Sequence, residues 1–421
     1  MKKATRQART KSAATSAAKV NWPVKRIKPE AVELCSKRLE RLKATVGGFV
    51  DVGRVSGAIT VIARRGRIAH LECFGAADLQ TRRPMAEDTI FRIYSMSKIV
   101  TSVAALMLAE EGKFLLTSPV AEFIPEFKDV QVGVKKEDGT TELVRPKREI
   151  VVHDLFTHMA GLGYDFGDLA ACSTLQEFVA NLCRKPLMCQ PGETWNYSFA
   201  VDVLGRLIEV VSGRPFDVFL KERLFEPLGM TDTGFWAPPE KAARLATMYK
   251  DNCEGGVGPF RLKPEDDFVP PGLWPGRPYY VPPKFPCGGS GLVSTTSDYL
   301  RFALMLLNDG ELNGVRLLSP KTIELMTEDG LPPGHGPINP LYWSFGFGLG
   351  VAVVRRLGEY KQHGSVGLYG WGSAAGCQVW IDPAEEMVSL IMLQILPNLP
   401  AGERFTVMDL FKQTAYQAIV E

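Results

Sequence analysis

The strongest hydrophobic pattern in the chain lies between residues 91 and 112. After an extended Phe-Arg-Ile-Tyr segment, apolar residues lie on nearly every side of a predicted helix that begins at Ser95. A helix that is apolar all round is expected inside a protein rather than on its surface. Gly112 follows Glu110 and Glu111, and it is suited to the left-handed conformation that ends a helix. The sequence therefore predicts a buried central helix.

Shorter patterns predict strands near both ends of the chain and helices between them. Apolar runs on either side of the turn Arg65-Gly66 indicate a hairpin near the N-terminus. If strands from the two termini form one sheet, with a helical insertion between them, the fold class is α+β with an antiparallel sheet flanked by helices. The predicted strands are 57–64, 67–74, 345–354, 377–381 and 387–393, an exposed hairpin lies within 132–149, and the predicted helices are 29–46, 199–211, 299–307 and 405–420.

The length of 421 residues suits two domains or one large composite. The start of the chain is basic, acid-free and without an apolar run, which indicates a disordered tail rather than a secretory signal. The predicted division is a tail over 1–25, a sheet domain formed by 26–100 and 340–421, and a mainly helical domain with cleft-wall loops over 101–339.

Composition narrows the class of protein. A formal net charge of +2 gives no reason to expect a nucleic-acid partner, and no apolar run approaches the length of a membrane span. The eight cysteines are scattered without a Cys-x-x-Cys pair, which favours reduced thiols in the cytoplasm. The five histidines form no metal-binding motif. We therefore expect no metal, no cofactor and no membrane partner, whereas the oligomeric state is not indicated.

Ser95 and Lys98 are the first candidates for chemistry. They are spaced i and i+3, so they share one face of the first helical turn. A lysine on a buried helix is costly unless it is neutral or paired, and a serine at a helix N-terminus lies where negative charge is favoured. The motif alone is weak, because Ser16 and Lys19 repeat it in the tail. The structural alternative is a helix cap beside a surface lysine.

Three further motifs favour a catalytic interpretation. Trp195-Asn196-Tyr197-Ser198 places a tyrosine just before a predicted helix, although a core aromatic is the structural alternative. The glycine run 287–294 allows close backbone approach. The segment 370–376, Gly-Trp-Gly-Ser-Ala-Ala-Gly, precedes a strand and could expose backbone N–H groups as oxyanion donors, or it could be a plain hairpin.

Together with Val152–Leu162, these motifs in this order resemble the family VIII carboxylesterases, which are serine esterases with a class C β-lactamase-like, penicillin-binding-protein fold. The resemblance extends from about Pro29 to the C-terminus. It implies Ser95 as the nucleophile, Lys98 as a deprotonated or proton-sharing amine, and Tyr197 as base or proton shuttle. It also implies an oxyanion hole formed by the backbone N–H groups of Ser95 and Ala374.

Departures from the β-lactamase motifs favour esters as substrates. Phe199 replaces the asparagine of Tyr-x-Asn, and Trp371-Gly372-Ser373 aligns with Lys-Thr-Gly, as in the Trp-x-Gly motif of the esterases. His363-Gly364-Ser365 is an alternative alignment. Apolar replacements suit an uncharged ester, so we expect Trp371, Gly372, Ser373 and Phe199 to bind substrate. No serine has glycine at both −2 and +2, which excludes the common Gly-x-Ser-x-Gly esterase motif.

The predicted function is a cytoplasmic serine carboxylesterase that acts on a small-molecule ester. Short acyl groups are expected, because Trp274, Tyr279 and Tyr280 belong to the long Pro-, Gly- and aromatic-rich segment 252–288, which would narrow the cleft. The alternatives are a β-lactamase or D-alanyl peptidase, an acyltransferase on the same fold, and a non-enzymatic scaffold. Weak cephalosporin hydrolysis is also expected, because ring opening needs the same serine and base.

Overall fold

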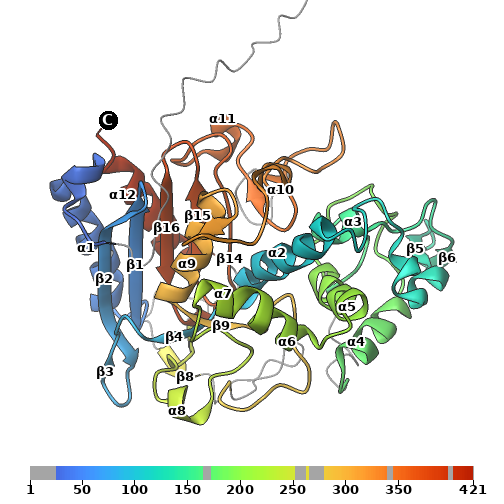
Figure 1. Cartoon of the computed structure of the whole chain (residues 1–421), viewed down its shortest axis with the longest axis horizontal. Coiled ribbons are helices and arrows are strands. Elements are labelled where there is room, and N and C mark those ends of the chain that lie inside the picture. Colours follow the sequence, from blue (N-terminus) through green and yellow to red (C-terminus); the bar gives the residue numbers. More distant parts are fainter. Residues whose placement is uncertain are drawn as a thin grey trace, which may run out of the picture.

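The structure is a computed structural model that describes residues 25–164, 172–251, 262–264, 279–338, 345–396 and 402–420. Its centre is an eight-stranded antiparallel sheet with the order β12-β13-β14-β15-β16-β1-β2-β3 (Figure 1). Strands from both ends of the chain thus share one sheet, and the predicted α+β fold is confirmed. The strands of this sheet are β1 Gly57–Arg64, β2 Arg67–Asp78, β3 Arg83–Pro84, β12 Gly346–Phe347, β13 Ala352–Val353, β14 Tyr369–Gly372, β15 Gln378–Asp382 and β16 Met387–Met392.

The pairing of β1 with β16 joins the two ends of the chain at the middle of the sheet. Val61 lies opposite Leu390, and both belong to the core on one face of the sheet. Ile62 belongs to the core on the other face, as does Ile391. Because successive side chains of a strand point to opposite faces, both faces of these strands must be covered. A sheet buried on both sides follows from this sequence.

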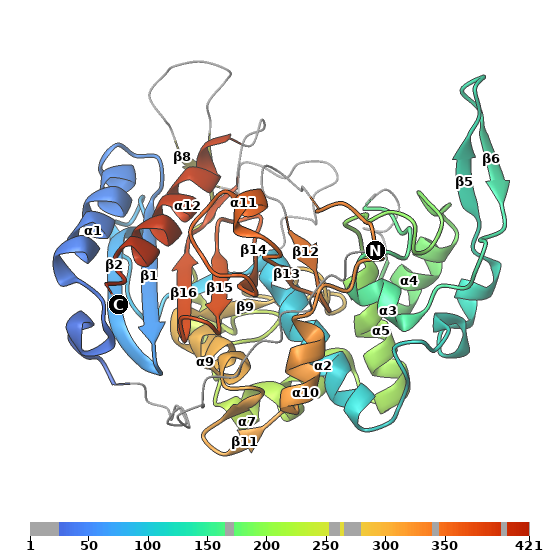
Figure 2. The same ribbon diagram turned by 90° about the horizontal axis from the view of Figure 1, so that it is seen from above.

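Helices cover the two faces. Helices α1 (Ser36–Asp51) and α12 (Gly402–Gln417) cover one face, and α9 (Thr296–Leu307) and α2 (Ser97–Glu110) lie against the other (Figure 2). Thr295 caps α9 by accepting a hydrogen bond from the Asp298 N–H at 3.2 Å. Helix α2 packs between the sheet and the helical region, which makes it the predicted central helix.

The helical region lies on the other side of α2 from the sheet, and the hairpin β5–β6 projects from it (Figure 2). Among the described residues, no helix has the length and apolar character that crossing a bilayer requires. The remaining helices are α3 Val152–Phe156, α4 Leu175–Cys183, α5 Ala200–Ser212, α6 Phe216–Leu220, α7 Glu226–Leu228, α8 Pro239–Ala242, α10 Pro320–Met326 and α11 Leu357–Tyr360, with a π-turn at Lys221–Phe225 and 3-10 turns at Pro29–Val32, Tyr94–Met96, Val120–Glu122 and Pro125–Asp129. The smaller sheets contain β4 Ile90–Arg92 with β9 Val293–Thr295, β5 Val132–Lys135 with β6 Thr141–Val144, β7 Tyr249–Asp251 with β8 Leu262–Pro264 and β17 Ile395–Leu396, and β10 Glu311–Leu312 with β11 Val315–Arg316.

Two of the predicted elements are each divided into two in the structure. The helix expected over 29–46 is a 3-10 turn followed by α1, because Glu33 adopts a left-handed conformation with φ 58° and breaks the helical path. The strand expected over 345–354 is two short strands, with Gly350 at φ +86° between them. A side chain at Gly350 would meet Ser102 Oγ at 2.0 Å, so only glycine fits there.

Some predictions concern residues outside those described. These are the tail over 1–24 and most of the long loop, including Trp274. Of the other two aromatic residues in that loop, Tyr279 is buried and Tyr280 is exposed. The residue bounds of the two domains stay a prediction.

Lys412, on α12, is a buried lysine that the sequence does not single out. Its Nζ lies 4.5 Å from the ring centroid of Tyr360 and 4.7 Å from that of Trp380, and it is hydrogen-bonded to the Tyr360 hydroxyl. Burial lowers the pKa of Lys412 to about 7, and the opposing charge of Asp409 is a smaller influence. Because an exposed lysine keeps its proton up to about pH 10.5, the unfolded chain binds more protons than the folded one between these values.

Lys412→Met is therefore expected to raise the free energy of unfolding at pH 7. The gain should shrink by up to about 1.4 kcal/mol per pH unit as the pH rises toward 10. At high pH, Lys412 is deprotonated in the unfolded chain too, so folding of the wild type no longer has to remove its proton. Urea unfolding at pH 7, 8 and 9 measures the difference. Lys37→Met, which removes an exposed lysine on α1, is the control that should show no such pH dependence. A gain that does not change with pH would contradict this assignment.

Candidate active site

Ser95 lies in a 3-10 turn that joins strand β4 to helix α2. The Ile93 N–H donates to the Leu292 carbonyl at 3.0 Å, and the Tyr299 hydroxyl donates to the Met96 carbonyl at 2.9 Å. Tyr94 has φ 38°, a left-handed conformation that is uncommon for a tyrosine. The backbone on both sides of Ser95 is thus fixed by contacts from distant parts of the chain. The α-helix itself begins at Ser97, two residues later than predicted.

Lys98 lies on the first turn of α2 and is only 1% exposed. Its Nζ donates to the Gly289 carbonyl at 2.7 Å and lies 3.4 Å from Ser95 Oγ. The same Nζ lies 4.6 Å from the ring centroid of Tyr197. One buried amine therefore contacts the other two predicted catalytic residues.

The charge of Lys98 is set by its neighbours. Burial by itself lowers the pKa of Lys98, yet Tyr164, Tyr197 and Asp202 raise it, and the net direction is upward. This upward direction favours the ammonium form of Lys98, which has no lone pair to accept a proton from Ser95. The family resemblance implies a deprotonated or proton-sharing amine at this position, and the catalytic role of Lys98 stays a prediction.

Tyr197 is held by an aromatic cluster at the entry to α5. The Trp371 indole Nε1 donates to the Tyr197 hydroxyl at 3.2 Å, and the two ring centroids are 5.6 Å apart. On another side, the His158 ring lies 4.8 Å from the Tyr197 ring. His363, the alternative marker of the third motif, is exposed in the loop after α11. Of the two candidates for the third motif, Trp371 is thus the one that contacts Tyr197.

His158 has a structural role at this site. Its Nδ1 accepts a hydrogen bond from the Ser198 N–H at 3.3 Å. Burial and the nearby Lys98 charge hold the pKa of His158 well below its ordinary value. The neutral ring therefore packs beside Tyr197 and fixes the backbone of the tyrosine motif.

Phe199 lies behind this cluster. It is 2% exposed, and its ring stacks on Tyr164 with centroids 4.4 Å apart and planes at 9°. Tyr164 in turn stacks on Tyr197, at 5.6 Å. Phe199 is therefore packed against Tyr164 and Phe178, and its predicted substrate-binding role stays a prediction.

The turn between β14 and β15 carries Ala374. Tyr94 and Ala374 pack against the same small apolar cluster, formed by Met248, Ala375 and Leu396, which places this turn beside the Ser95 turn. The Ser373 hydroxyl accepts a hydrogen bond from the Cys377 N–H at 2.9 Å, so this side chain closes the turn. Gly372 ends β14.

Known proteins share this architecture. The β-lactamase family profile matches residues 42–411, which is most of the chain. The chain belongs to the β-lactamase family. An uncharacterized protein of Mycobacterium tuberculosis is 34% identical over 86% of this chain and 91% of its own length. Esterase EstB of Burkholderia gladioli is 31% identical over 84% of this chain and 89% of its own.

Solved structures confirm the β-lactamase-like fold. EstCE1, a hydrolase with promiscuous acyltransferase activity, has a TM-score of 0.72 and 24% identity, covering 91% of this chain and 98% of its own. Simvastatin Synthase (LovD) from Aspergillus terreus has a TM-score of 0.75 and 23% identity, covering 90% and 98%. At these identities the likeness shows the fold alone. The predicted resemblance to esterases on the β-lactamase fold is confirmed by the family match and by Esterase EstB.

Sequence reasoning missed three groups at this β-lactamase-family site. They are the Tyr164 ring, the Asp202 carboxylate and the Gly289 carbonyl, each of which faces Lys98. Tyr164 directly follows the Gly161-Leu162-Gly163 turn, and Asp202 follows the tyrosine motif on α5. Their closeness to recognised motifs was the only available signal, because the contacts themselves join distant segments.

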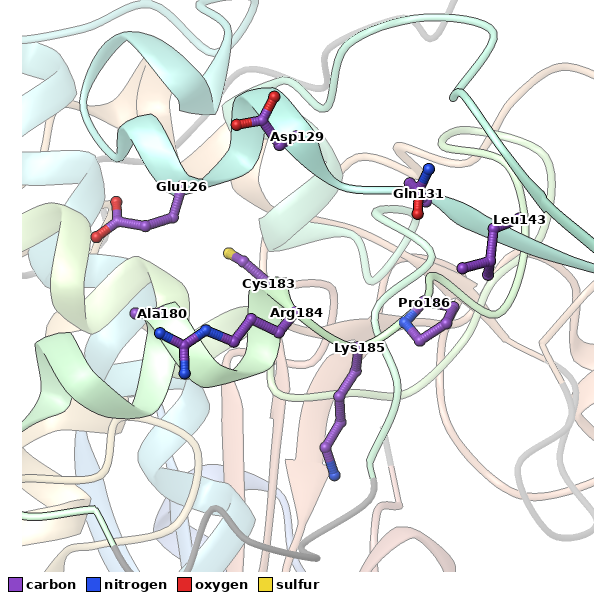
Figure 3. Close-up of a pocket in the computed structure, with 9 residues that line it drawn as sticks. All are labelled: Glu126, Asp129, Gln131, Leu143, Ala180, Cys183, Arg184, Lys185 and Pro186. Carbon is purple, nitrogen blue, oxygen red and sulfur yellow. The ribbon is translucent and has the colours of Figure 1, made fainter.

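In the described part of the chain, no cluster of His, Cys, Asp and Glu residues is suited to bind a metal ion. A separate hollow of about 280 Å³ lies beside α4, and none of the residues discussed above lines it. In Figure 3 the Arg184 and Lys185 side chains extend away from one another, so they do not converge on one anion. The chemistry is concentrated around Lys98 instead.

Trp371→Phe is expected to lower kcat for an ester by about two- to tenfold, with little change in stability. The substitution keeps an aromatic ring against Tyr197 and removes only the hydrogen bond to its hydroxyl, which contributes about 0.5–1.5 kcal/mol. Steady-state kinetics and thermal unfolding measure the two effects. Trp236→Phe, which alters a tryptophan on the wall of a different hollow, is the matched control. Unchanged kcat would show that the indole N–H does not position Tyr197.

Proposed function

We propose that this protein is a serine carboxylesterase of the family VIII type, which hydrolyses small uncharged esters through an acyl-enzyme on Ser95. The observation that carries the proposal is the meeting of Ser95 and Tyr197 at one buried ammonium, Lys98. The relationship to Esterase EstB supports the reaction class. The motif that binds the carboxylate of a β-lactam in other members is replaced here by Trp371, which suits an uncharged substrate.

The chemistry starts with Tyr197 as the base. Because Lys98 is protonated, the Tyr197 phenolate beside it takes the proton of the Ser95 hydroxyl. The Ser95 oxygen attacks the ester carbonyl carbon, and the developing oxyanion is stabilised by the backbone N–H groups of Ser95 and Ala374. Tyr197 then gives its proton to the departing alcohol. The Lys98 ammonium favours the phenolate each time it forms.

Deacylation repeats these steps with water. Tyr197 accepts a proton from the attacking water, which adds to the acyl carbon, and the proton returns to Ser95 as the acid leaves. A second alcohol in place of water would give acyl transfer. Monacolin J acid methylbutanoyltransferase of Aspergillus terreus is 27% identical over 82% of this chain, which supports acyltransferase activity as the second candidate.

The acyl group is expected to be short. Support for this comes from an aromatic pair at the Ser95 turn: Tyr94 precedes Ser95, and its ring meets that of Tyr279 edge-on at 6.5 Å. The cytoplasmic location remains part of the proposal, supported by seven free thiols among the described cysteines. The partner proposed is a small-molecule ester, with no nucleic acid.

Hydrolysis of p-nitrophenyl esters from acetate to dodecanoate tests the reaction class and the acyl length. We expect the highest kcat/KM with acetate or butanoate and slower turnover of the cephalosporin nitrocefin. Added short-chain alcohol should divert part of the product to a new ester if acyl transfer competes with hydrolysis. Nitrocefin cleavage without ester hydrolysis would assign the protein to the β-lactamases instead, and a preference for dodecanoate would contradict the size argument.

A further inference from the structure

Asp202 is a buried acid that takes no direct part in the proposed mechanism. It lies on the first turn of α5, and its side chain is 1% exposed. A carboxylate that is removed from water is costly unless it is hydrogen-bonded and paired with a cation. The question is therefore which groups compensate it.

Asp202 and Lys98 both form hydrogen bonds with Gly289. Oδ1 of Asp202 accepts hydrogen bonds from the Gly289 N–H at 3.0 Å and from the Cys287 thiol at 2.8 Å. The Gly289 carbonyl accepts a hydrogen bond from the Lys98 ammonium at 2.7 Å. Gly289 is thus bonded through its N–H to the anion and through its carbonyl to the cation.

The spacing between the two charges follows from the space around Gly289. A methyl group built on Gly289 would lie 2.6 Å from Oδ2 of Asp202 and 3.3 Å from Nζ of Lys98. The carboxylate and the ammonium are therefore no more than about 6 Å apart, a separation at which opposite charges shift each other's pKa. Only glycine leaves room for both.

Besides Tyr197, the titratable groups near Lys98 and Asp202 include the Tyr164 phenol, the Cys287 thiol and the His158 imidazole. Burial raises the pKa of the Tyr164 phenol, and burial together with Asp202 raises the pKa of the Cys287 thiol well above its ordinary value. His158 is neutral. Burial also raises the pKa of Asp202 itself, and the Lys98 charge and two hydrogen bonds oppose that rise. Among the described residues, the titratable groups that interact with this pair are Tyr164, Tyr197, His158 and Cys287.

We propose that Asp202 is a positioning residue that acts as the buried counter-charge of Lys98 and, through Gly289, holds the ammonium between Ser95 and Tyr197. Its catalytic consequence rests on the proposed function, whereas the charge pairing can be measured without any substrate. The variant Asp202→Asn keeps the size of the side chain and an oxygen that accepts hydrogen bonds, so it removes chiefly the charge.

The pH dependence of ester hydrolysis provides the first test. Without the Asp202 charge, the Lys98–Tyr197 pair loses its proton more easily, because a neighbouring anion no longer favours the protonated pair. The acidic limb of the kcat/KM profile should therefore move to lower pH by about one unit in Asp202→Asn. Asp298→Asn is the matched control, since this buried acid bonds to the Asp232 N–H and the Thr233 hydroxyl instead. If Asp202 were only a structural residue, Asp202→Asn would change the activity without moving the acidic limb of the kcat/KM profile. An acidic limb that does not move would therefore overturn the proposal.

Thermal unfolding of Lys98→Met, Asp202→Asn and the double variant provides the second test. Each single variant leaves one buried charge or polar group without its partner, whereas the double variant leaves neither charge. The double variant should therefore unfold at a higher temperature than Asp202→Asn. Additive losses, or a double variant that fails to fold when Asp202→Asn also fails, would overturn the pairing. This cycle needs no substrate, so it distinguishes a failure of the pairing from a failure of the proposed esterase function.

Discussion

Ser95→Ala is expected to lower kcat for p-nitrophenyl acetate by at least about 10⁴-fold. The substitution removes the oxygen that forms the acyl-enzyme, so only binding and the oxyanion donors remain to accelerate direct attack by water. The fold should be retained, because the backbone of the Ser95 turn is held by Leu292 and Tyr299 rather than by the serine side chain. Steady-state and single-turnover kinetics measure the loss.

The matched control for this experiment is Ser102→Ala. Ser102 is buried on the same helix, and its hydroxyl has no hydrogen-bond partner among the described residues. Its removal should leave kcat within about twofold of wild type, since no contact with Ser95 or Tyr197 is lost. Equal losses in the two variants would point to damage of α2 rather than to loss of a nucleophile.

Tyr197→Phe is expected to lower kcat by about 10²–10⁴-fold, the range that a general base contributes. The phenyl ring keeps the contacts with Lys98 and His158, so the change isolates the hydroxyl. If the phenolate is the base, the residual activity should also lose the acidic limb that wild type shows. Kinetics from pH 5 to pH 10 would record both effects.

Tyr369→Phe is the control for the tyrosine substitution. Tyr369 is a buried tyrosine on β14, and its hydroxyl has no partner among the described residues. We expect it to retain wild-type kcat and pH dependence. If Tyr197→Phe behaved like this control, Tyr197 would not be the base and the proton would have to leave Ser95 by another route.

Much of the fold could be predicted because its causes are local. Apolar residues recur along β1 and β16, and α2 is apolar on all sides, so strands, central helix and burial follow from short windows of sequence. The start of α2 could not be predicted, because a left-handed turn at Tyr94 precedes it and follows β4, whose partner β9 lies far away in the sequence.

In the candidate site, too, local motifs could be predicted and contacts between distant segments could not. The motif order identified Ser95, Lys98 and Tyr197, and the structure brings all three together, while their catalytic roles remain predictions. The charge of Lys98 could not be predicted from its burial alone. It depends on Tyr164 and Asp202, which belong to distant segments that only the folded chain brings to the amine.

Labelling with a fluorophosphonate, followed by peptide mass spectrometry, tests the central claim most directly. The reagent phosphonylates an activated serine, so we predict one label per chain, located on Ser95, with loss of ester hydrolysis in proportion to labelling. The label should be absent in Ser95→Ala and slow in Tyr197→Phe. Stoichiometric labelling of another residue, or full ester hydrolysis by an enzyme already labelled on Ser95, would contradict the assignment of Ser95 as the nucleophile.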